Sequence, residues 1–306
     1  MKAALGILLT LLVTATAPEK KMVEVNKPDM IPNQEPIFSF GILADVQYCD
    51  CESFNTRFYR NSLTKLGEAL RSFSDQKVDF IINLGDLIDR EYESFEKVLQ
   101  MISASGIPAH HCLGNHDFSV HPRDSRKVVQ VTGTKTGYYS FAYEGFRFIM
   151  LNGNEIAVYS PSHSGKKEAE RLLNELSEAG EPNAYDWNGG IGAEQLVWLG
   201  KELDRAVSNN EKVFLMCHFP VFPQGTHNLF NSSSVLTILA KYDNIISWFN
   251  GHNHDGGYGN YKMIHFVTFR GMVESSATNS FAVVDVYGNK LWIKGSGREK
   301  SQILAY

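Results

Sequence analysis

The sequence of 306 residues has few cysteines and no excess of positive charge. Lysine and arginine total 29 against 34 acidic residues, which gives a formal net charge of -5. The chain therefore has no overall basic field that would gather nucleic acid or an anionic lipid surface. Four cysteines are too few for a disulfide scaffold in a chain of this length. Because 43% of the residues are hydrophobic, we expect a globular protein with a large apolar core.

The four cysteines are expected to be buried free thiols. Cys49 and Cys51 are separated by one residue, where a bond between them is expected to be strained. Cys112 and Cys217 stand at the ends of apolar runs. This placement favours buried thiols over a redox function or thiolate ligands to a metal.

Beyond its first residues the sequence also lacks an apolar run of the roughly 20 residues that a membrane-spanning helix needs. The N-terminus, "MKAALGILLTLLVTATAPEKK", has one lysine, a short apolar stretch and then small residues, which is the layout of an export signal. We predict a signal peptide at residues 1–17, with cleavage near Ala15 or Ala17, and hence a periplasmic or secreted protein. An uncleaved anchor is the alternative. Residues 18–36 are interpreted as a polar leader, and residues 37–306 as the folded domain.

The first part of the domain alternates between apolar runs and stretches with helical spacing. Because strands joined through helices pair in parallel, the loops that follow them gather at one edge of a sheet. The expected strands are "IFSFGILAD" (37–45), "VDFIINLGD" (78–86) and "IPAHHCLGNHD" (107–117), with helices between them at 59–73 and 93–104.

The second part starts with an antiparallel hairpin, "YYSFAYEGFRFIMLNG" (138–153). A polar interruption follows at 152–192, which we interpret as a lid or a substrate-side insertion. The regular pattern then resumes as one helix and several strands. These are the helix at 193–207 and the strands at 212–220, 244–255, 263–271 and 280–295.

Polar side chains end five of the expected strands. All of them carry oxygen or imidazole donors and none is a thiol, a set that suits manganese, iron or zinc better than a soft metal. Taken singly, each has an ordinary structural explanation: a helix cap, a turn, or a core histidine. Taken together, they favour a metal site where the strand ends meet. The residues are Asp45 with Gln47, Asp86, Asn115 with His116, His218, and His252 with His254.

The motifs around these residues resemble the signature of the calcineurin-like metallophosphoesterases. They are "ADVQ" (44–47), "GD" (85–86), "GNHD" (114–117), "CHFP" (217–220) and "GHNH" (251–254). The resemblance implies an α/β four-layer sandwich, with two mixed β-sheets packed face to face between flanking helices. It also implies two divalent ions. One would be held by Asp45, Gln47, Asp86 and His254, and the other by Asp86, Asn115, His218 and His252, with Asp86 bridging.

The same resemblance implies a phosphohydrolase that works through a metal-bridging hydroxide. His116 is then expected beside the leaving oxygen, to which it donates a hydrogen bond or a proton. Asp117 is expected to orient His116.

Gln47 departs from the general family pattern, which has a histidine at this place. An amide oxygen is a weaker and harder donor, so we expect two manganese ions, with iron, zinc or magnesium as alternatives. The Asp-x-Gln motif resembles the manganese-dependent ADP-ribose/CDP-alcohol diphosphatases. Further stretches that resemble them are "FYRNSL" (58–63), "DWNGGIGAEQLVWL" (186–199), "CHFPVFP" (217–223), "GHNHDGGY" (251–258) and "GMVES" (271–275). This implies cleavage of the diphosphate bond in nucleoside-diphosphate-linked small molecules. Candidate substrate contacts are Arg57, Tyr59, Arg60 and Tyr258, with Phe54, Phe58 and Trp187 as further aromatic candidates. The alternative is that most of these aromatic side chains belong to the core and that the arginines are solvated.

Two other interpretations remain open, and a third is disfavoured. The same metal pair would serve a phosphomonoesterase or a cyclic-nucleotide phosphodiesterase. A non-catalytic scaffold would keep the fold, but it would not need His116. Purple acid phosphatases, which are iron-containing relatives, are disfavoured because they need a tyrosine ligand where this chain has Asp89. The oligomeric state is not predicted from the sequence.

Overall fold

Two mixed six-stranded sheets pack face to face in the computed structural model, which describes residues 34–306. Residues Glu35–Tyr306 form one compact unit. The predicted signal peptide (1–17) and all but the last residues of the predicted leader (18–36) lie outside the described residues. Within residues 34–306, no helix has both the length and the apolar character to cross a membrane.

The first sheet combines three parallel strands with three antiparallel ones, in the order β12-β11-β10-β1-β2-β3. β1, β2 and β3 run parallel, as the alternation of strands and helices predicts. The strand bounds are β1 (Phe38–Leu43), β2 (Phe80–Asn83), β3 (Ala109–His111), β10 (Ser280–Val286), β11 (Lys290–Gly297) and β12 (Gln302–Ala305).

The second sheet has the order β4-β5-β6-β7-β9-β8, with β5, β6, β7 and β9 parallel. The predicted hairpin is confirmed as the antiparallel pair β4 and β5. The strand bounds are β4 (Tyr139–Tyr143), β5 (Phe146–Met150), β6 (Lys212–Met216), β7 (Ile245–Asn250), β8 (Gly257–Tyr261) and β9 (Ile264–Thr268).

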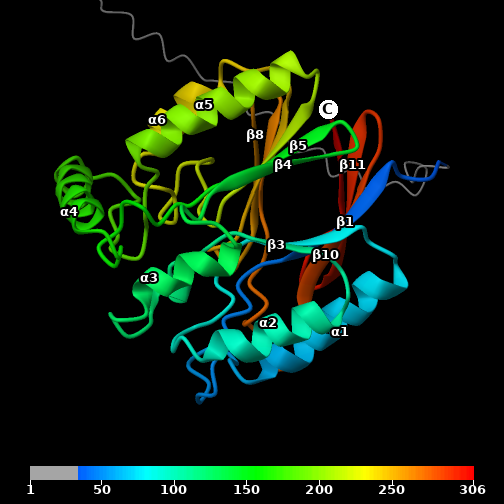
Figure 1. Ribbon diagram of the computed structural model, residues 1–306, viewed down its shortest axis with the longest axis horizontal. Helices are drawn as coiled ribbons and strands as arrows, with labels where there is room; N and C mark the ends of the chain where they lie inside the picture. The colour runs from blue at the N-terminus through cyan, green and yellow to red at the C-terminus, as the bar shows by residue number, and fades with distance from the viewer. Residues whose placement is uncertain (1–33) are drawn as a thin grey trace, which may run out of the picture. The chain divides into compact units, whose positions relative to one another are not determined.

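Helices cover the outer faces of both sheets, so the expected four-layer sandwich is confirmed (Figure 1). α1 and α2 pack on the first sheet, while α5 and α6 pack on the second. In α1 the buried Leu66, Leu70 and Phe73 recur at helical spacing and form the packing face. The helix bounds are α1 (Asn61–Asp75), α2 (Ser94–Ala104), α3 (Ser125–Val128), α4 (His163–Glu178), α5 (Ala193–Ser208) and α6 (Ser232–Leu239).

Aromatic side chains fill the space between the sheets. Phe40 of β1 stacks on Phe80 of β2 at 5.4 Å, and Phe148 of β5 stacks on Phe214 of β6 at 4.9 Å. Phe40 also meets Phe148 edge to face, which joins the two sheets. Each fully buried phenylalanine contributes about 1.5–3 kcal/mol, so this layer fixes the distance between the two sheets.

The cysteine prediction is right for one pair and wrong for the other. Cys112 and Cys217 are buried free thiols. Cys49 and Cys51 are bonded in a disulfide, which corrects the expectation of free thiols. The physical reason is that the chain turns between them, with their Cα atoms 5.3 Å apart, a separation that a disulfide spans.

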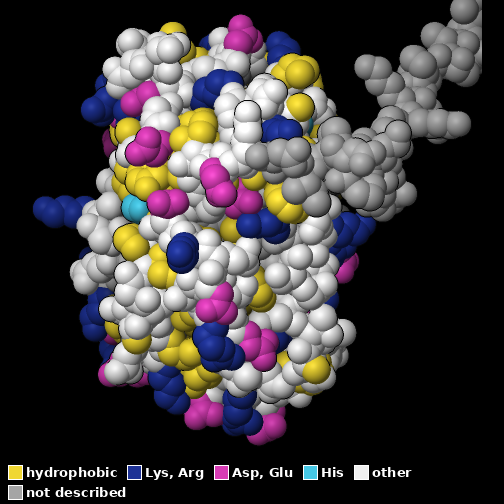
Figure 2. Space-filling model, turned by 90° about the vertical axis from the view of Figure 1, so that its right-hand side faces the viewer, with side chains coloured by type: hydrophobic (Ala, Val, Ile, Leu, Met, Phe, Trp, Pro, Cys, Tyr) yellow, Lys and Arg dark blue, Asp and Glu magenta, His cyan; other side chains and the backbone are white. Residues whose placement is uncertain are grey.

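The surface carries charges of both signs. Figure 2 shows one face of the molecule, on which acidic and basic side chains are interspersed. On this face neither sign forms a continuous field, in keeping with the small net charge of -5.

Candidate metal centre

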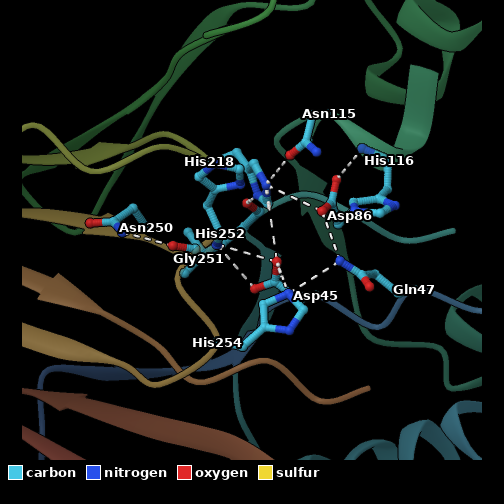
Figure 3. A network of polar contacts seen from close by, with 12 residues as sticks. Asp45, Gln47, Asp86, Asn115, His116, His218, Asn250, Gly251, His252 and His254 are labelled. Carbon is cyan, nitrogen blue, oxygen red and sulfur yellow. Dashed lines mark hydrogen bonds and ion pairs between the residues drawn. The ribbon is translucent and has the colours of Figure 1, made fainter. Parts of the chain in front are cut away.

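The predicted ligands lie in the loops that follow strands of both sheets. Asp45 and Gln47 follow β1, Asp86 follows β2, and the loop after β3 supplies Asn115. The histidines come from the other sheet: His218 follows β6, while His252 and His254 follow β7. The strand ends thus belong to two sheets, whereas a single parallel sheet would place them all along one edge. The two face-to-face sheets present their carboxyl ends at a shared edge, which brings the side chains together (Figure 3).

The donor atoms converge within hydrogen-bonding range. His218 Nε2 lies 3.3 Å from Asp86 Oδ2 and 3.1 Å from Asn115 Oδ1. His254 Nε2 lies 3.3 Å from Asp45 Oδ1. Asp45, Asp86 and His218 are fully buried, and each offers a ligand atom within 4.8 Å of the other two. Buried carboxylates facing imidazole nitrogens are the donors that a divalent transition metal prefers.

Each of the three histidines has one ring nitrogen held by an acceptor outside the cluster. This contact fixes the tautomer, because the held nitrogen carries the proton and the other keeps its lone pair. For His218 and His254 the free nitrogen is the Nε2 that faces the carboxylates. The held contacts are His218 Nδ1 to the Leu84 carbonyl (2.9 Å), His252 Nε2 to Asn188 Oδ1 (2.9 Å) and His254 Nδ1 to Glu274 Oε1 (2.7 Å).

Gln47 also fits a metal ligand. Its Nε2 lies 3.1 Å from Asp86 Oδ2 and 3.2 Å from His254 Nε2, which places the amide among the other donors. Its Oε1 is buried without a hydrogen-bond partner, and such a group costs about 1–3 kcal/mol unless something satisfies it. A half-turn of the amide exchanges these two atoms and turns the oxygen toward the cluster. The donor set therefore fits two hard divalent ions.

The loops that carry the ligands adopt backbone conformations that ordinary residues avoid. Four predicted ligands have positive φ angles, each costing on the order of 1–3 kcal/mol, and such outliers gather at functional sites. These are Asp45 (51°), Gln47 (44°), Asp86 (55°) and His252 (69°).

Two motif glycines are required by close approach to the carboxylates. A Cβ on Gly251 would lie 2.5 Å from Asp45 Oδ2, and a Cβ on Gly114 would collide with Asp86 Oδ1. The loops therefore close over the carboxylates only because these two residues have no side chain.

His116 is oriented by Asp89 and not by Asp117, which corrects the sequence-based expectation. His116 Nδ1 lies 3.1 Å from Asp89 Oδ1. Asp117 instead accepts hydrogen bonds from three backbone amides, those of Asp86, Ile88 and Gly114, and so ties the loops together. Sequence proximity suggested Asp117, but the chain turns its carboxylate inward.

Charge around the centre shifts the ionisation of its members. Burial lowers the pKa of His116, but the carboxylates of Asp86 and Asp89 raise it above the usual value. The hydrogen bond from His254 lowers the pKa of Glu274 to about 2. Glu274 is therefore an anion behind His254 at neutral pH.

Two adjoining cavities open onto the centre. One has a volume of about 340 Å³ and is lined by His116, Asn115 and Trp187 as well as by the cluster. The other has a volume of about 520 Å³ and extends toward Thr56 and Arg298. Both are lined by Arg57, His227, His252 and His254, so the cluster and Arg57 lie where the two meet.

Only one of the four predicted substrate contacts lies in these cavities. Arg57 lines both, and its Nη1 is 3.3 Å from His116 Nε2. Tyr59 is only 3% exposed and packs against Cys49 and Val273. Arg60 forms ion pairs with Asp50 and Glu52, and Tyr258 of β8 contacts His265. Tyr59, Arg60 and Tyr258 line neither cavity, because Tyr59 packs in the core, Arg60 forms surface ion pairs, and Tyr258 lies exposed on β8 beside His265.

Sequence reasoning missed several residues that surround the centre. They are Asp89, Asn188, His227 and Glu274. Asp89 and Glu274 carry a weak signal, since each lies within four residues of a predicted motif or of a strand end. Asn188 is marked only by its place in the stretch 186–199, and His227 carries no signal, because both reach the centre from long connecting segments.

Comparison with known proteins agrees with this geometry. The model of the calcineurin-like phosphoesterase family matches residues 38–256. The chain is 29% identical, over 92% of its length, to the manganese-dependent ADP-ribose/CDP-alcohol diphosphatase of Homo sapiens, of which it covers 96%. It is 30% identical to the protein of that name from Oryza sativa subsp. japonica, covering 87% of this chain and 93% of that one. A solved dimetal phosphatase from Danio rerio superposes with a TM-score of 0.80 at 25% identity, covering 89% of this chain and 100% of that one. The chain therefore belongs to the calcineurin-like phosphoesterase family.

Proposed function

We propose that this protein is a manganese-dependent hydrolase of the diphosphate bond in nucleoside-diphosphate-linked small molecules, such as ADP-ribose and CDP-alcohols. The observation that carries the proposal is the complete donor set, with the amide of Gln47 among its oxygen ligands and His116 beside it. Relatives named for this activity match most of the chain, which supports the choice of substrate class.

Two sets of residues would each hold one of two bound ions. Asp45, Gln47, Asp86 and His254 would hold one ion, and Asp86, Asn115, His218 and His252 the other. Bound at these residues, the ions would supply positive charge that stabilises the phosphoryl oxygens. They would also lower the pKa of water, so that hydroxide is available as the nucleophile near neutral pH.

The proton for the leaving group comes from His116. Its Nδ1 faces Asp89, so Nε2 is the nitrogen that points toward Arg57 and the cavity. Asp89 stabilises the protonated ring, and His116 then gives its proton to the oxygen that departs. Arg57, whose guanidinium lies beside His116, binds a phosphoryl oxygen of the substrate.

The shape of the site supports a substrate with groups on both sides of the reacting phosphorus. The two cavities meet at Arg57 and the histidines, so one half of a diphosphate-linked molecule can occupy each. A monoester would fill only one of them.

The test is turnover by metal-stripped protein restored with manganese, zinc or magnesium in parallel. ADP-ribose, CDP-choline and p-nitrophenyl phosphate are the substrates, and release of AMP or CMP is measured by chromatography. We expect manganese to restore cleavage of the first two far better than zinc does, because Gln47 replaces an imidazole ligand.

The control for this experiment is His116→Ala with manganese, which should release little product. Preference for p-nitrophenyl phosphate would instead support a phosphomonoesterase. Failure to cleave all three substrates with every metal would support a non-catalytic protein of the same fold.

A further inference from the structure

Glu274 lies between the metal centre and the predicted proton donor. Its Oε1 is 2.7 Å from His254 Nδ1 and 3.8 Å from Arg57 Nε. Arg57 in turn places Nη1 3.3 Å from His116 Nε2. One carboxylate thus contacts a predicted metal ligand on one side and, through Arg57, reaches the proton donor on the other.

The backbone around Glu274 is held on both sides. The amides of Met272 and Val273 donate to the carbonyls of Ala44 and Asp45 at 2.9 and 3.0 Å. On the other side, Glu274 forms an isolated bridge with Arg57. The segment 272–275 is therefore fastened to the loop that carries Asp45 and to the strand-like turn that carries Arg57.

Lys65 of α1 also holds the segment 272–275, through hydrogen bonds to its backbone carbonyls. It is 2% exposed, and its ammonium donates to the carbonyls of Glu274 (3.1 Å), Ser275 (2.9 Å) and Met272. A carboxylate on a backbone held at this many points has a fixed position, which a positioning function requires.

The contact with His254 has a definite chemical effect. An acceptor at Nδ1 keeps the proton there, so the lone pair of Nε2 points toward Asp45 and Gln47. A negatively charged acceptor also makes the ring a stronger donor to a metal. Glu274 has a side chain only 13% exposed, so solvent screens this effect weakly.

We propose that Glu274 is a positioning residue that serves both halves of the centre, by fixing His254 as a metal ligand and Arg57 against His116. The proposal rests on the proposed function, since it assigns a task within the same site. It extends beyond the ligand set, because Glu274 reaches the metals and the substrate only through other side chains.

The test compares Glu274→Gln and Glu274→Ala with the unaltered protein. Manganese binding to metal-stripped protein is measured by calorimetric titration, and turnover at saturating manganese is measured separately. We expect manganese affinity to fall by about 10-fold in the glutamine variant and up to about 100-fold in the alanine variant. Turnover should fall further in both, because the guanidinium of Arg57 loses its ion pair with Glu274.

A double-mutant cycle separates the two contacts. Arg57→Ala alone should lower turnover and leave manganese affinity within about twofold, since Arg57 holds no metal. Combined with Glu274→Ala, its effect on turnover should be less than additive, because both changes disrupt the same arrangement.

Glu299→Gln is the matched control. The carboxylate of Glu299 accepts hydrogen bonds from the backbone amides of Arg270 and Lys300, and it contacts neither His254 nor Arg57. This variant should bind manganese like the unaltered protein. Thermal unfolding of every metal-free variant shows whether the fold is kept. If Glu274→Ala does not fold, the test uses the isosteric Glu274→Gln alone.

Manganese affinity within twofold of normal in both Glu274 variants would overturn the inference, whatever the substrate proves to be. Weakened manganese binding supports it even if ADP-ribose and CDP-choline are not cleaved. In that case the proposed function fails and the positioning of His254 stands.

Discussion

At the scale of single residues, two neighbouring carboxylates have different tasks. Asp89 faces His116, whereas Asp117 accepts hydrogen bonds from three backbone amides and is fully buried. The first affects the chemistry and the second holds the loops that carry Asp86 and Gly114. Replacing each carboxylate by its amide separates these tasks.

Asp89→Asn should lower kcat by roughly 10- to 100-fold, because the protonated ring of His116 loses its anionic partner. Manganese affinity should stay within about twofold. Steady-state kinetics and manganese titration check this, and unchanged kcat would show that Asp89 does not act on His116.

Asp117→Asn should lower the free energy of unfolding by about 1–3 kcal/mol, since the new amide group faces backbone donors that then lack an acceptor. Urea unfolding of the metal-free protein measures this. A variant as stable as the unaltered protein would mean that the three amides find other acceptors.

His116→Ala should keep both metals and lose most turnover, by about 100- to 10,000-fold. Elemental analysis of the purified variant gives the metal content. Loss of metal would assign His116 to the ligands instead of to proton donation.

The convergence of the predicted ligands could be anticipated from the sequence, whereas the residues that support them could not. Each ligand closes an apolar run, and the strand that precedes it fixes its place at the sheet edge. Asn188 contacts His252, which lies 64 residues away in the sequence, and Glu274 contacts His254, which lies 20 residues away. Such contacts depend on how loops pack, and local residue patterns do not encode that packing.

At the scale of secondary structure, the strands flanked by helices and the β4–β5 hairpin were predictable, whereas the edge strand β8 was not. β8 has the sequence "GYGNY", is mostly exposed, and lacks the apolar alternation that marks a strand. It exists because it pairs with β9 as a hairpin. The short α6 was missed for a related reason, since eight residues give little helical periodicity.

β3 carries a histidine that makes stability depend on pH. Burial lowers the pKa of His110 to about 4, and its ring stacks on Phe141 at 3.8 Å. In the unfolded chain the pKa is near 6.5, so below that pH the unfolded state binds the proton more readily. This contribution to stability is complete above pH 6.5 and is lost as the pH falls toward 4.

We therefore expect the free energy of unfolding to fall less between pH 7 and pH 5 in His110→Leu than in the unaltered protein. The difference between the two losses should be about 1–2 kcal/mol, as measured by urea unfolding. Both measurements use EDTA, so that metal binding does not contribute. His121 is exposed, and His121→Leu is the control that should behave like the unaltered protein. Equal losses in all three proteins would contradict the prediction.

At the scale of the whole molecule, the metal centre joins the two sheets. Asp45, Asp86 and Asn115 come from the first sheet, while His218 and His254 come from the second. A metal held from both sides opposes their separation, so binding adds to the stability of the entire fold.

Adding manganese to metal-stripped protein should raise the free energy of unfolding by about 2.7 kcal/mol at 100 times Kd. For a chain of this size each kcal/mol raises Tm by about 2–4 °C. Scanning calorimetry with manganese or EDTA measures the shift. Asp86→Asn, which removes the carboxylate that we propose serves both ions, should show a much smaller shift, and an equal one would place the ions elsewhere.

The division between strand ends and connecting segments has an evolutionary consequence. The metal donors come from the ends of core strands, whereas Trp187, His227 and Arg57 reach the cavities from segments that link the main elements. Mutations at Trp187 and His227 can alter which molecule enters without removing a predicted metal ligand, Arg57 or His116. Proteins that descend from one ancestor can therefore differ in substrate specificity while they keep the same reaction.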